Sequence, residues 1–265
     1  MSDRDPRLDG ETGRAFNWVL NGLGDVRDSG GWIASIEAWV RRAKDEAHRL
    51  PIFPPVALAV ACAAHDIAPI ASCSTALHLA TGLQGDGHEA EFGGAASDVL
   101  VFLAQSFLAE IEDDQKVHRI VRCLGYAGIR MAKGRARHAA APLPSTAEEA
   151  DSLVLSAMQK TGTAYAYYAQ SAAVAGGVPS RHWEALWRWG KSVGGARQLL
   201  ADAAAIPGTE AESFLLSKAE QLLAEARGHL AEIWLPWGGR ALFEAVADKE
   251  NMAIPETIAA TRASN

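Results

Sequence analysis

The sequence is short of cysteine and has no excess of basic residues, and each shortage excludes a class of protein. Three cysteines in 265 residues cannot build a disulfide framework, and no C-x-x-C pair offers a zinc site. The 25 Lys and Arg residues against 32 Asp and Glu residues give a net charge of −7. A general nucleic-acid binder needs a basic excess, so we expect no nucleic-acid partner.

Long apolar runs are also missing. Gly, His or Asp interrupts every candidate run before the roughly 18 residues that a membrane span needs. Residues 1–10 are polar and charged, unlike a signal peptide. These features predict a soluble, cytoplasmic protein without a membrane span.

Short motifs for common chemistries do not occur either. The sequence has no H-E-x-x-H zinc pair, no G-x-S-x-G nucleophile turn, no P-loop and no dinucleotide fingerprint. Asp113 and Asp114 are paired carboxylates, but no third carboxylate follows at helical spacing, and their polar surroundings predict a solvated loop. His78 lies in an apolar segment, where it is either a core histidine with a satisfied ring or a residue that lines a pocket.

Helix-forming sequence is what the chain has in abundance. Ala, Leu, Glu and Arg dominate, and alternating β-branched stretches with hairpin turns are missing, so we expect an all-α protein. Residues 56–83 are nearly apolar all round, which is typical of helix in the middle of a bundle. Ser145 and Glu148 form a capping-box start for a long helix that ends near Gly177. Further helices are expected over residues 93–108, 117–131, 183–205, 210–234 and 236–251. The predicted organisation is one helical domain over residues 1–265, with a basic linker at 133–138 and frayed tails at 1–14 and 255–265.

Four segments, taken in order, resemble the trans-isoprenyl diphosphate synthase (polyprenyl synthetase) family. Residues 148–177 contain a Lys-Thr pair followed by small residues and an Ala/Gly-rich turn, and residues 190–202 read GKSVGGARQLLAD. Residues 131–135 (MAKGR) stand where the family has Met-x-x-Gly-Gln, and residues 235–242 (LPWGGRAL) resemble its Leu-Pro…Arg-x-Leu segment. The resemblance implies an isoprenoid-synthase-like bundle of mostly antiparallel helices around a central cavity. It also implies that the protein binds a prenyl diphosphate through magnesium.

The aspartate-rich motifs of this family are incomplete here. When His78 is set on the family's histidine, the D-D-x-x-D motif falls on residues 85–89, where only Asp86 and Glu89 are acidic. The second motif keeps Gln198 and Asp202 and loses its other aspartate to Ala201. Phe53, Pro54 and Pro55 replace an expected basic segment, and no Arg-Arg-Gly follows the first motif.

The resemblance nevertheless implies a site. Asp86, Glu89 and Asp202 are the candidate catalytic residues and magnesium ligands. Because magnesium prefers a few carboxylates completed by substrate phosphates, we expect weak metal binding that the substrate completes, or no metal at all. The candidate substrate-binding residues are Lys160, Thr161, Gln198, Ala80, Thr81 and His78. Ala80 and Thr81 are small, so the pocket for the prenyl chain is expected to run past them, towards Leu77 and Ser74.

Two functions follow from the resemblance. The first is a non-elongating prenyltransferase or a terpene synthase, since the basic residues for a second diphosphate are missing. The alternative is a catalytically silent protein, either a regulatory subunit of a heteromeric prenyl diphosphate synthase or a prenyl-chain binding protein. The expected partners are a prenyl diphosphate and a second subunit, in a homodimer or in a heterodimer with a catalytic synthase. Residues 95–108 either supply the dimer face or belong to the internal core.

Overall fold

The computed structural model describes residues 5–25, 32–50, 52–62, 66–85, 89–236 and 238–249, without the side chains of residues 84–94. Within these ranges every regular element is helical, which confirms the all-α prediction. The labelled elements are α1 (Pro6–Asp25), α2 (Trp32–Arg49), α3 (Pro54–Cys62), α4 (Ile67–Gly85), α5 (Glu89–Leu108), α6 (Asp114–Ala140), α7 (Ala147–Gln159), α8 (Thr161–Ala175), the 3₁₀ turn η1 (Ser180–His182), α9 (Trp183–Ala204) and α10 (Glu210–Ala231). Residues 239–249 form a further helical segment.

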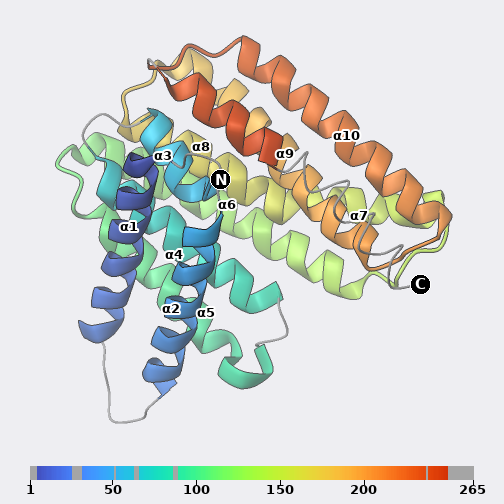
Figure 1. The fold of residues 1–265 in the computed structure, drawn as a ribbon, viewed down its shortest axis with the longest axis horizontal. Coiled ribbons are helices and arrows are strands. Elements are labelled where there is room, and N and C mark those ends of the chain that lie inside the picture. Colours follow the sequence, from blue (N-terminus) through green and yellow to red (C-terminus); the bar gives the residue numbers. More distant parts are fainter. Residues whose placement is uncertain are drawn as a thin grey trace.

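The helices form two sets that share α6 and α8. In Figure 1, α1 and α2 stand side by side in front of α4 and α5, while α9 and α10 run obliquely across the other half of the molecule. One apolar core joins α1–α6, α8 and the first half of α9. A second, smaller core lies between α7, the last turns of α9 and the first turns of α10. The ends of α6 and α8 thus lie where the two sets of helices meet.

Helix α8 is the central member of the bundle. Its residues from Gly162 to Ala169 are all buried, and its three tyrosines are among the largest fully buried side chains. Glycines of α9 allow the two helices to approach closely, because a Cβ on Gly190 would lie 2.5 Å from the backbone nitrogen of Ala166. This close approach brings the start of α8 against the middle of α9.

The C-terminal segment packs back onto α9 and α10. The rings of Phe243 and Trp189 lie 4.5 Å apart between centroids. Arg240 donates hydrogen bonds to the carbonyl oxygens of Leu230 (2.8 Å) and Ile233 (2.9 Å), which satisfies free acceptors at the end of α10.

Several predicted boundaries are wrong, and the reasons are local. Residues 6–14, expected to be part of a frayed tail, form the first turns of α1, because Leu8 and Thr12 are buried on its inner face. Residues 133–138, expected to be a linker, continue α6, which ends before Pro142, where the pyrrolidine ring disfavours helix. Lys and Arg are good helix formers, and this polar stretch still buries Gly134.

The long helix predicted from Ser145 is in fact two helices. The N-cap is Thr146, which forms a capping box with Glu149, one residue later than predicted. The chain then breaks at Lys160, whose φ of −83° and ψ of −89° are not helical, and α8 begins at Thr161.

Asp113, expected in a loop, accepts hydrogen bonds from the backbone of Gln115 and Lys116 and caps α6.

Candidate functional site

A cavity of about 580 Å³ lies where α4, α6, α8 and α9 meet, and we call it the polar cavity. Its described lining comprises His78, Thr81, Gly82, Met131, Arg135, His138, Lys160, Thr161, Ala164, Tyr165, Tyr168, Arg197, Gln198, Leu200, Ala201 and Asp202. The volume is within the range of ordinary ligand pockets.

A chain of hydrogen bonds runs along one wall of the polar cavity. Thr161 Oγ1 donates to Gln198 Oε1 at 2.6 Å, and Gln198 Nε2 donates to Asp202 Oδ1 at 2.8 Å. His138 Nε2 lies 3.0 Å from the same Oδ1. Asp202 Oδ2 is buried and accepts no hydrogen bond from any described residue. The chain ties α8 to α9 and α9 to α6, so these side chains are held in fixed positions.

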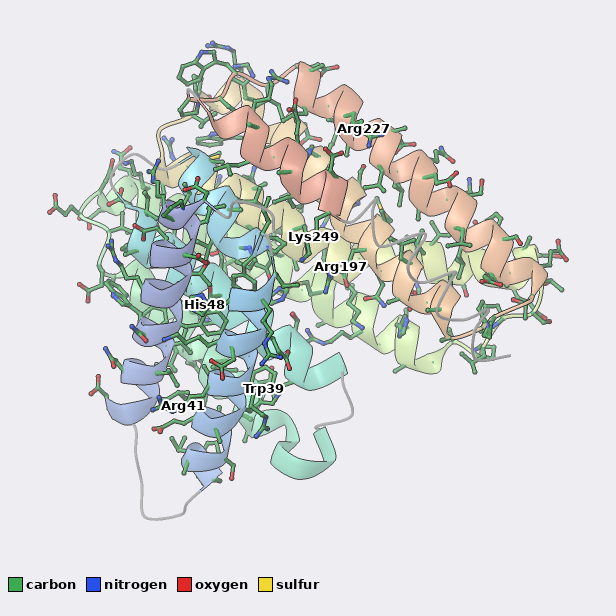
Figure 2. The ribbon with its side chains drawn as sticks, in the orientation of Figure 1. Trp39, Arg41, His48, Arg197, Arg227 and Lys249 are labelled. Carbon is green, nitrogen blue, oxygen red and sulfur yellow. The ribbon has the colours of Figure 1, made fainter. Side chains whose placement is uncertain are left out.

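Positive charge dominates the described lining. It contains three basic side chains, those of Arg135, Lys160 and Arg197, and the carboxylate of Asp202. The three basic residues come from α6, from the break between α7 and α8, and from α9. Figure 2 labels Arg197 and, from the C-terminal segment, Lys249, near the centre of the view.

His78 is an uncharged part of this cavity. Burial of its ring, followed by the positive charges of Arg197 and Lys249, lowers the pKa of His78 to about 3. The ring packs edge-on against Phe53, with 5.3 Å between centroids. His78 therefore lines the polar cavity and also packs against the buried ring of Phe53.

A second cavity of about 440 Å³, the apolar cavity, lies between α4, α5 and α6. Its lining comprises Leu77, Ala80, Thr81, Ser97, Asp98, Val101, Gln105, Val121, Leu124, Gly125, Gly128, Ile129, Met131 and Arg135. It shares Thr81, Met131 and Arg135 with the polar cavity. The two cavities are therefore neighbours, with these three residues in the lining of both.

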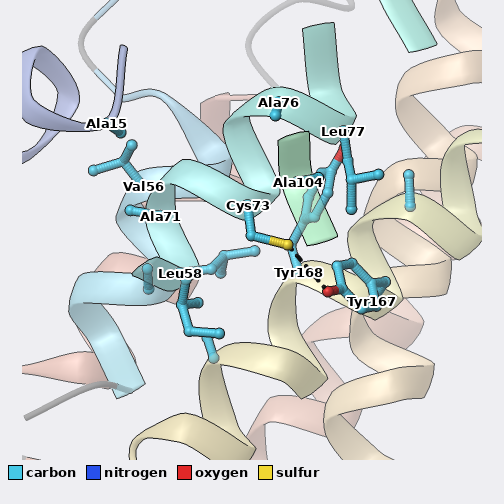
Figure 3. Close-up of a cluster of buried hydrophobic side chains, with 14 of the residues drawn as sticks. Ala15, Val56, Leu58, Ala71, Cys73, Ala76, Leu77, Ala104, Tyr167 and Tyr168 are labelled. Atoms are coloured by element: carbon cyan, nitrogen blue, oxygen red, sulfur yellow. Dashed lines mark hydrogen bonds between the residues drawn. The ribbon is translucent and has the colours of Figure 1, made fainter. Parts of the chain in front are cut away.

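Nearer to its N-terminus, α4 packs closely against α8. Figure 3 shows Cys73 of α4 reaching Tyr167 of α8, with Sγ and the hydroxyl oxygen 3.4 Å apart. Burial raises the pKa of the Cys73 thiol to about 12, so this thiol is neutral. Leu77 lines the apolar cavity, whereas Ser74 is fully buried and is not part of its lining.

The structure brings most of the sequence-predicted residues to these two cavities. His78, Lys160, Thr161, Gln198 and Asp202 line the polar cavity. Ala80 lines the apolar cavity, and Thr81 lines both.

Two of the predicted carboxylates cannot be placed in the same way. Asp86 lies outside the described residues, and Glu89 begins α5 with a side chain that is not described. No group of three His, Cys, Asp or Glu side chains in the described part of the chain could hold a metal ion. Asp202 is the predicted carboxylate whose side chain the structure describes: its Oδ1 accepts from Gln198, and its Oδ2 has no hydrogen-bond partner among the described residues.

Sequence reasoning missed Arg135, His138 and Arg197. Met131, Arg135 and His138 are spaced four and three residues apart, and this spacing places them on one face of a helix. The spacing would have identified them if residues 133–138 had been assigned to α6. Arg197 adjoins Gln198 within a segment that the prediction had already singled out, and Ala201, four residues later, lines the same cavity.

Comparison with solved structures identifies the fold. A geranylgeranyl pyrophosphate synthetase from the archaeon Geoglobus acetivorans matches 94% of this chain and 98% of its own, with a TM-score of 0.74 and 16% identity. A polyprenyl synthase from Caulobacter crescentus, solved with calcium and isoprenyl diphosphate, matches 91% of this chain and 94% of its own, with a TM-score of 0.68 and 19% identity. A deletion mutant of the heterotetrameric geranyl pyrophosphate synthase of mint matches 92% of this chain and 99% of its own, with a TM-score of 0.71 and 14% identity. The chain therefore has the isoprenoid-synthase fold, as the sequence resemblance implied.

At the level of sequence, no family model and no curated protein matches the chain. Across the residues that the structure describes, no helix combines the length and the apolar character that a membrane crossing needs.

Proposed function

We propose that this protein binds a prenyl diphosphate, with the diphosphate in the polar cavity and the prenyl chain in the apolar cavity. The observation that carries the proposal is the contiguity of the two cavities at Thr81, Met131 and Arg135. A prenyl diphosphate has an anionic head and an apolar tail. A cavity with basic side chains in its described lining, joined to a largely apolar one, matches both ends of such a ligand.

Our first candidate activity is that of a non-elongating prenyltransferase or a terpene synthase. The observation that favours it is the His138–Asp202 pair at the polar cavity. A histidine held by a carboxylate has a fixed ring orientation and can take up a proton. Such a group suits the removal of a proton from an acceptor or from a cyclised product. Arg135, Lys160 and Arg197 would orient the diphosphate, and the apolar walls would keep water from the chain.

A second candidate is a catalytically silent subunit of a heteromeric prenyl diphosphate synthase. The incomplete aspartate-rich motifs of the sequence favour it, with Gly85 and Ala201 where the family has aspartates, because diphosphate ionisation in this fold family is expected to need several acidic groups. The mint synthase that this chain resembles in fold is heterotetrameric. In this case the ligand would be held and not converted.

We also propose that a second subunit packs on α5 and α6. Large apolar side chains are exposed on these two helices at Phe102 (68%), Tyr126 (66%), Ile129 (59%) and Val121 (44%). Val121 and Ile129 also line the apolar cavity. A partner on this face would therefore cover one wall of that cavity.

One experiment tests both candidates. The purified protein is incubated with geranyl, farnesyl and geranylgeranyl diphosphate and magnesium, with and without isopentenyl diphosphate, and the products are identified by mass spectrometry. Cyclised or transferred products that are lost in His138→Gln support the first candidate. Unchanged ligand, together with an altered product of an added catalytic synthase, supports the second. Efficient chain elongation by the protein alone overturns both, and a failure to bind any of the diphosphates overturns the proposed function itself.

A further inference from the structure

We infer that a groove between α6 and α9 binds a nucleoside phosphate, at a site separate from the polar and apolar cavities. The groove, which we call the α6–α9 groove, has a volume of about 600 Å³, and its lining includes Arg119, Arg122, Arg130, Gln170, Trp183 and Trp187. None of its described lining residues also lines the polar or the apolar cavity. The inference therefore goes beyond the proposed function and does not depend on it.

The groove lies over α8, on which both α6 and α9 pack. Gln170 and Val174 of α8 form its floor. The chain from residue 95 to residue 236, which contains these three helices, is described without a gap and with its side chains. Tyr126 also lines the groove, so the groove borders the α5–α6 face that we propose for a second subunit.

The α6 wall of the groove is basic. Arg119, Arg122 and Arg130 are three and eight residues apart, which places them on one face of the helix over about three turns. In the described part of the chain, neither Arg122 nor Arg130 has an ion-pair partner. The carboxylate of Glu184, which also lines the groove, is exposed and is held by Arg188 at 2.9 Å. Arginine binds phosphate oxygens in pairs, so this wall suits a ligand with phosphate groups.

A further positive charge lies at the far end of the groove. Lys191 is on α9, one turn after Trp187, and is half-buried. Burial of its amine, and then the positive charge of Arg130, lower the pKa of Lys191. Arg130 and Lys191 are thus close enough to repel each other, and an anion between them would remove that repulsion.

The α9 wall of the groove is aromatic. Trp183 and Trp187 are four residues apart and line the same groove. The indole of Trp183 is held in place, because its Nε1 donates to the carbonyl oxygen of Val178 at 2.8 Å. The Cζ of Arg119 lies 5.5 Å from the centroid of the Trp183 ring, so a cation–π contact orients this guanidinium. Aromatic side chains stack on nucleobases of any kind, which makes a base the fitting partner for this wall.

The floor of the groove supplies a polar group for the edge of a base. Burial raises the pKa of the Cys123 thiol to about 12, so the thiol keeps its proton and donates to Gln170 Oε1 at 2.9 Å. The amide of Gln170 therefore keeps its Nε2 as a donor. Arginines on one wall, indoles on the other and an amide on the floor match the phosphates and the base of a nucleotide. The volume is within the range of ordinary ligand pockets.

The test is calorimetry of the full chain in EDTA with three probes, namely ATP, tripolyphosphate and adenosine. We expect ATP to bind with a Kd below about 1 mM, and about tenfold or more tightly than either of the other two probes. The reason is that only ATP offers a base to the indoles and phosphates to the arginines at the same time. A failure to bind ATP overturns the inference. An affinity for tripolyphosphate or adenosine that equals the affinity for ATP also overturns it.

Variants connect the binding to the groove. Arg122→Gln and Trp187→Leu should each weaken ATP binding by about tenfold or more. Trp187 packs against the core, so circular dichroism and thermal unfolding show whether that variant still folds, whereas Arg122 is exposed. Arg137→Gln is the matched control, because Arg137 is exposed on the same helix but is bonded to Gln159 and does not line the groove. An unchanged Kd for ATP in Arg122→Gln overturns the inference.

Farnesyl diphosphate separates this site from the site of the proposed function. A saturating concentration of it should not displace ATP, and Arg122→Gln should bind it with an unchanged Kd. Displacement of ATP by farnesyl diphosphate would place ATP in the polar cavity, which overturns the inference and leaves the proposed function in place. Binding of ATP that depends on Arg122, in a chain that binds no prenyl diphosphate, supports the inference and overturns the proposed function.

Discussion

The imidazole Nε2 of His138 lies 3.0 Å from Oδ1 of Asp202, which links α6 to α9 across one wall of the polar cavity. The same oxygen accepts from Gln198 Nε2 at 2.8 Å. Asp202 therefore holds the side chains of His138 and Gln198 in place along this wall of the cavity. Asp202→Ala and Asp202→Asn separate the charge of this residue from its ability to accept a hydrogen bond.

Asp202→Ala should lower the free energy of unfolding by about 1 to 3 kcal/mol, because a half-buried donor on Gln198 loses its acceptor. Asp202→Asn keeps an oxygen at the same place and should cost clearly less. Urea denaturation followed by circular dichroism measures both values. Equal losses in the two variants would show that the charge of Asp202, and not its hydrogen bonds, stabilises the fold.

Filling the apolar cavity should abolish discrimination between long and short prenyl chains. Each buried methylene contributes about 0.8 kcal/mol, so the unmodified protein should bind farnesyl diphosphate more tightly than dimethylallyl diphosphate. Ala80→Phe should erase this preference. Gly128→Leu should have a similar effect with less disturbance of the fold, since no atom lies within 4 Å of a Cβ at Gly128.

The control for the cavity is Gly228→Leu on α10, where a Cβ also meets open space and which does not line either cavity. It should leave the preference for the longer chain intact. If the unmodified protein binds the two diphosphates equally well, the apolar cavity does not receive the prenyl chain.

The depressed pKa of His78 predicts a loss of stability in acid. The pKa is about 3 in the folded protein against an ordinary value of 6.5, so the unfolded chain binds more protons between these values. The contribution of the neutral His78 ring to the free energy of unfolding is fully present above pH 6.5 and is lost as the pH falls towards 3. Between pH 7 and pH 5 the free energy of unfolding should fall by about 1 to 2 kcal/mol. In His78→Gln this part of the pH dependence should be absent, and an unchanged slope would mean that other groups cause it.

Gly190→Ala should destabilise the protein, because the added Cβ would meet the backbone of Ala166 in α8 at 2.5 Å. Overpacking of this kind costs about 1 to 3 kcal/mol. Gly228→Ala, at an open position of a helix, should stabilise the protein by up to about 1 kcal/mol. Chemical denaturation of the two variants measures the change in the free energy of unfolding for each. We expect a decrease for Gly190→Ala and an increase for Gly228→Ala.

The exposed apolar face of α5 and α6 should mediate self-association. Analytical ultracentrifugation of the unmodified protein should show a dimer, and Phe102→Glu/Ile129→Glu should yield monomers, because two charges would be buried without partners. Leu155→Glu on α7 is the control, since Leu155 is 48% exposed on another helix. A dimer that survives the double substitution would place the interface elsewhere.

The fold class and part of the candidate site could be predicted from the sequence alone. Helix propensity and the period of apolar residues are local properties, so they identified most of the helices. They did not predict α1, and residues 56–83, expected as one helical stretch, belong to α3 and α4. Gln198 and Asp202 are four residues apart on α9, and this spacing is enough to predict that they share a face. The order of the segments that carry the resemblance identified the isoprenoid-synthase fold, which the solved structures confirm.

Only the tertiary structure decided which side chains meet across helices. Arg135 and His138 reach the polar cavity because α6 continues past Met131, and Lys160 reaches it because the chain breaks at that residue. The continuation of α6 has local support in the helix propensity of Lys and Arg, and the burial of Gly134 against Gln159 and Lys160 adds to it. The break at Lys160 has no clear local signal and occurs where α8 packs closely on α9. The sequence by itself thus determined the helices and the residues along each of them. The packing of one helix on another, which is set by contacts distant in sequence, decided which basic side chains line the polar cavity and that this cavity adjoins an apolar one.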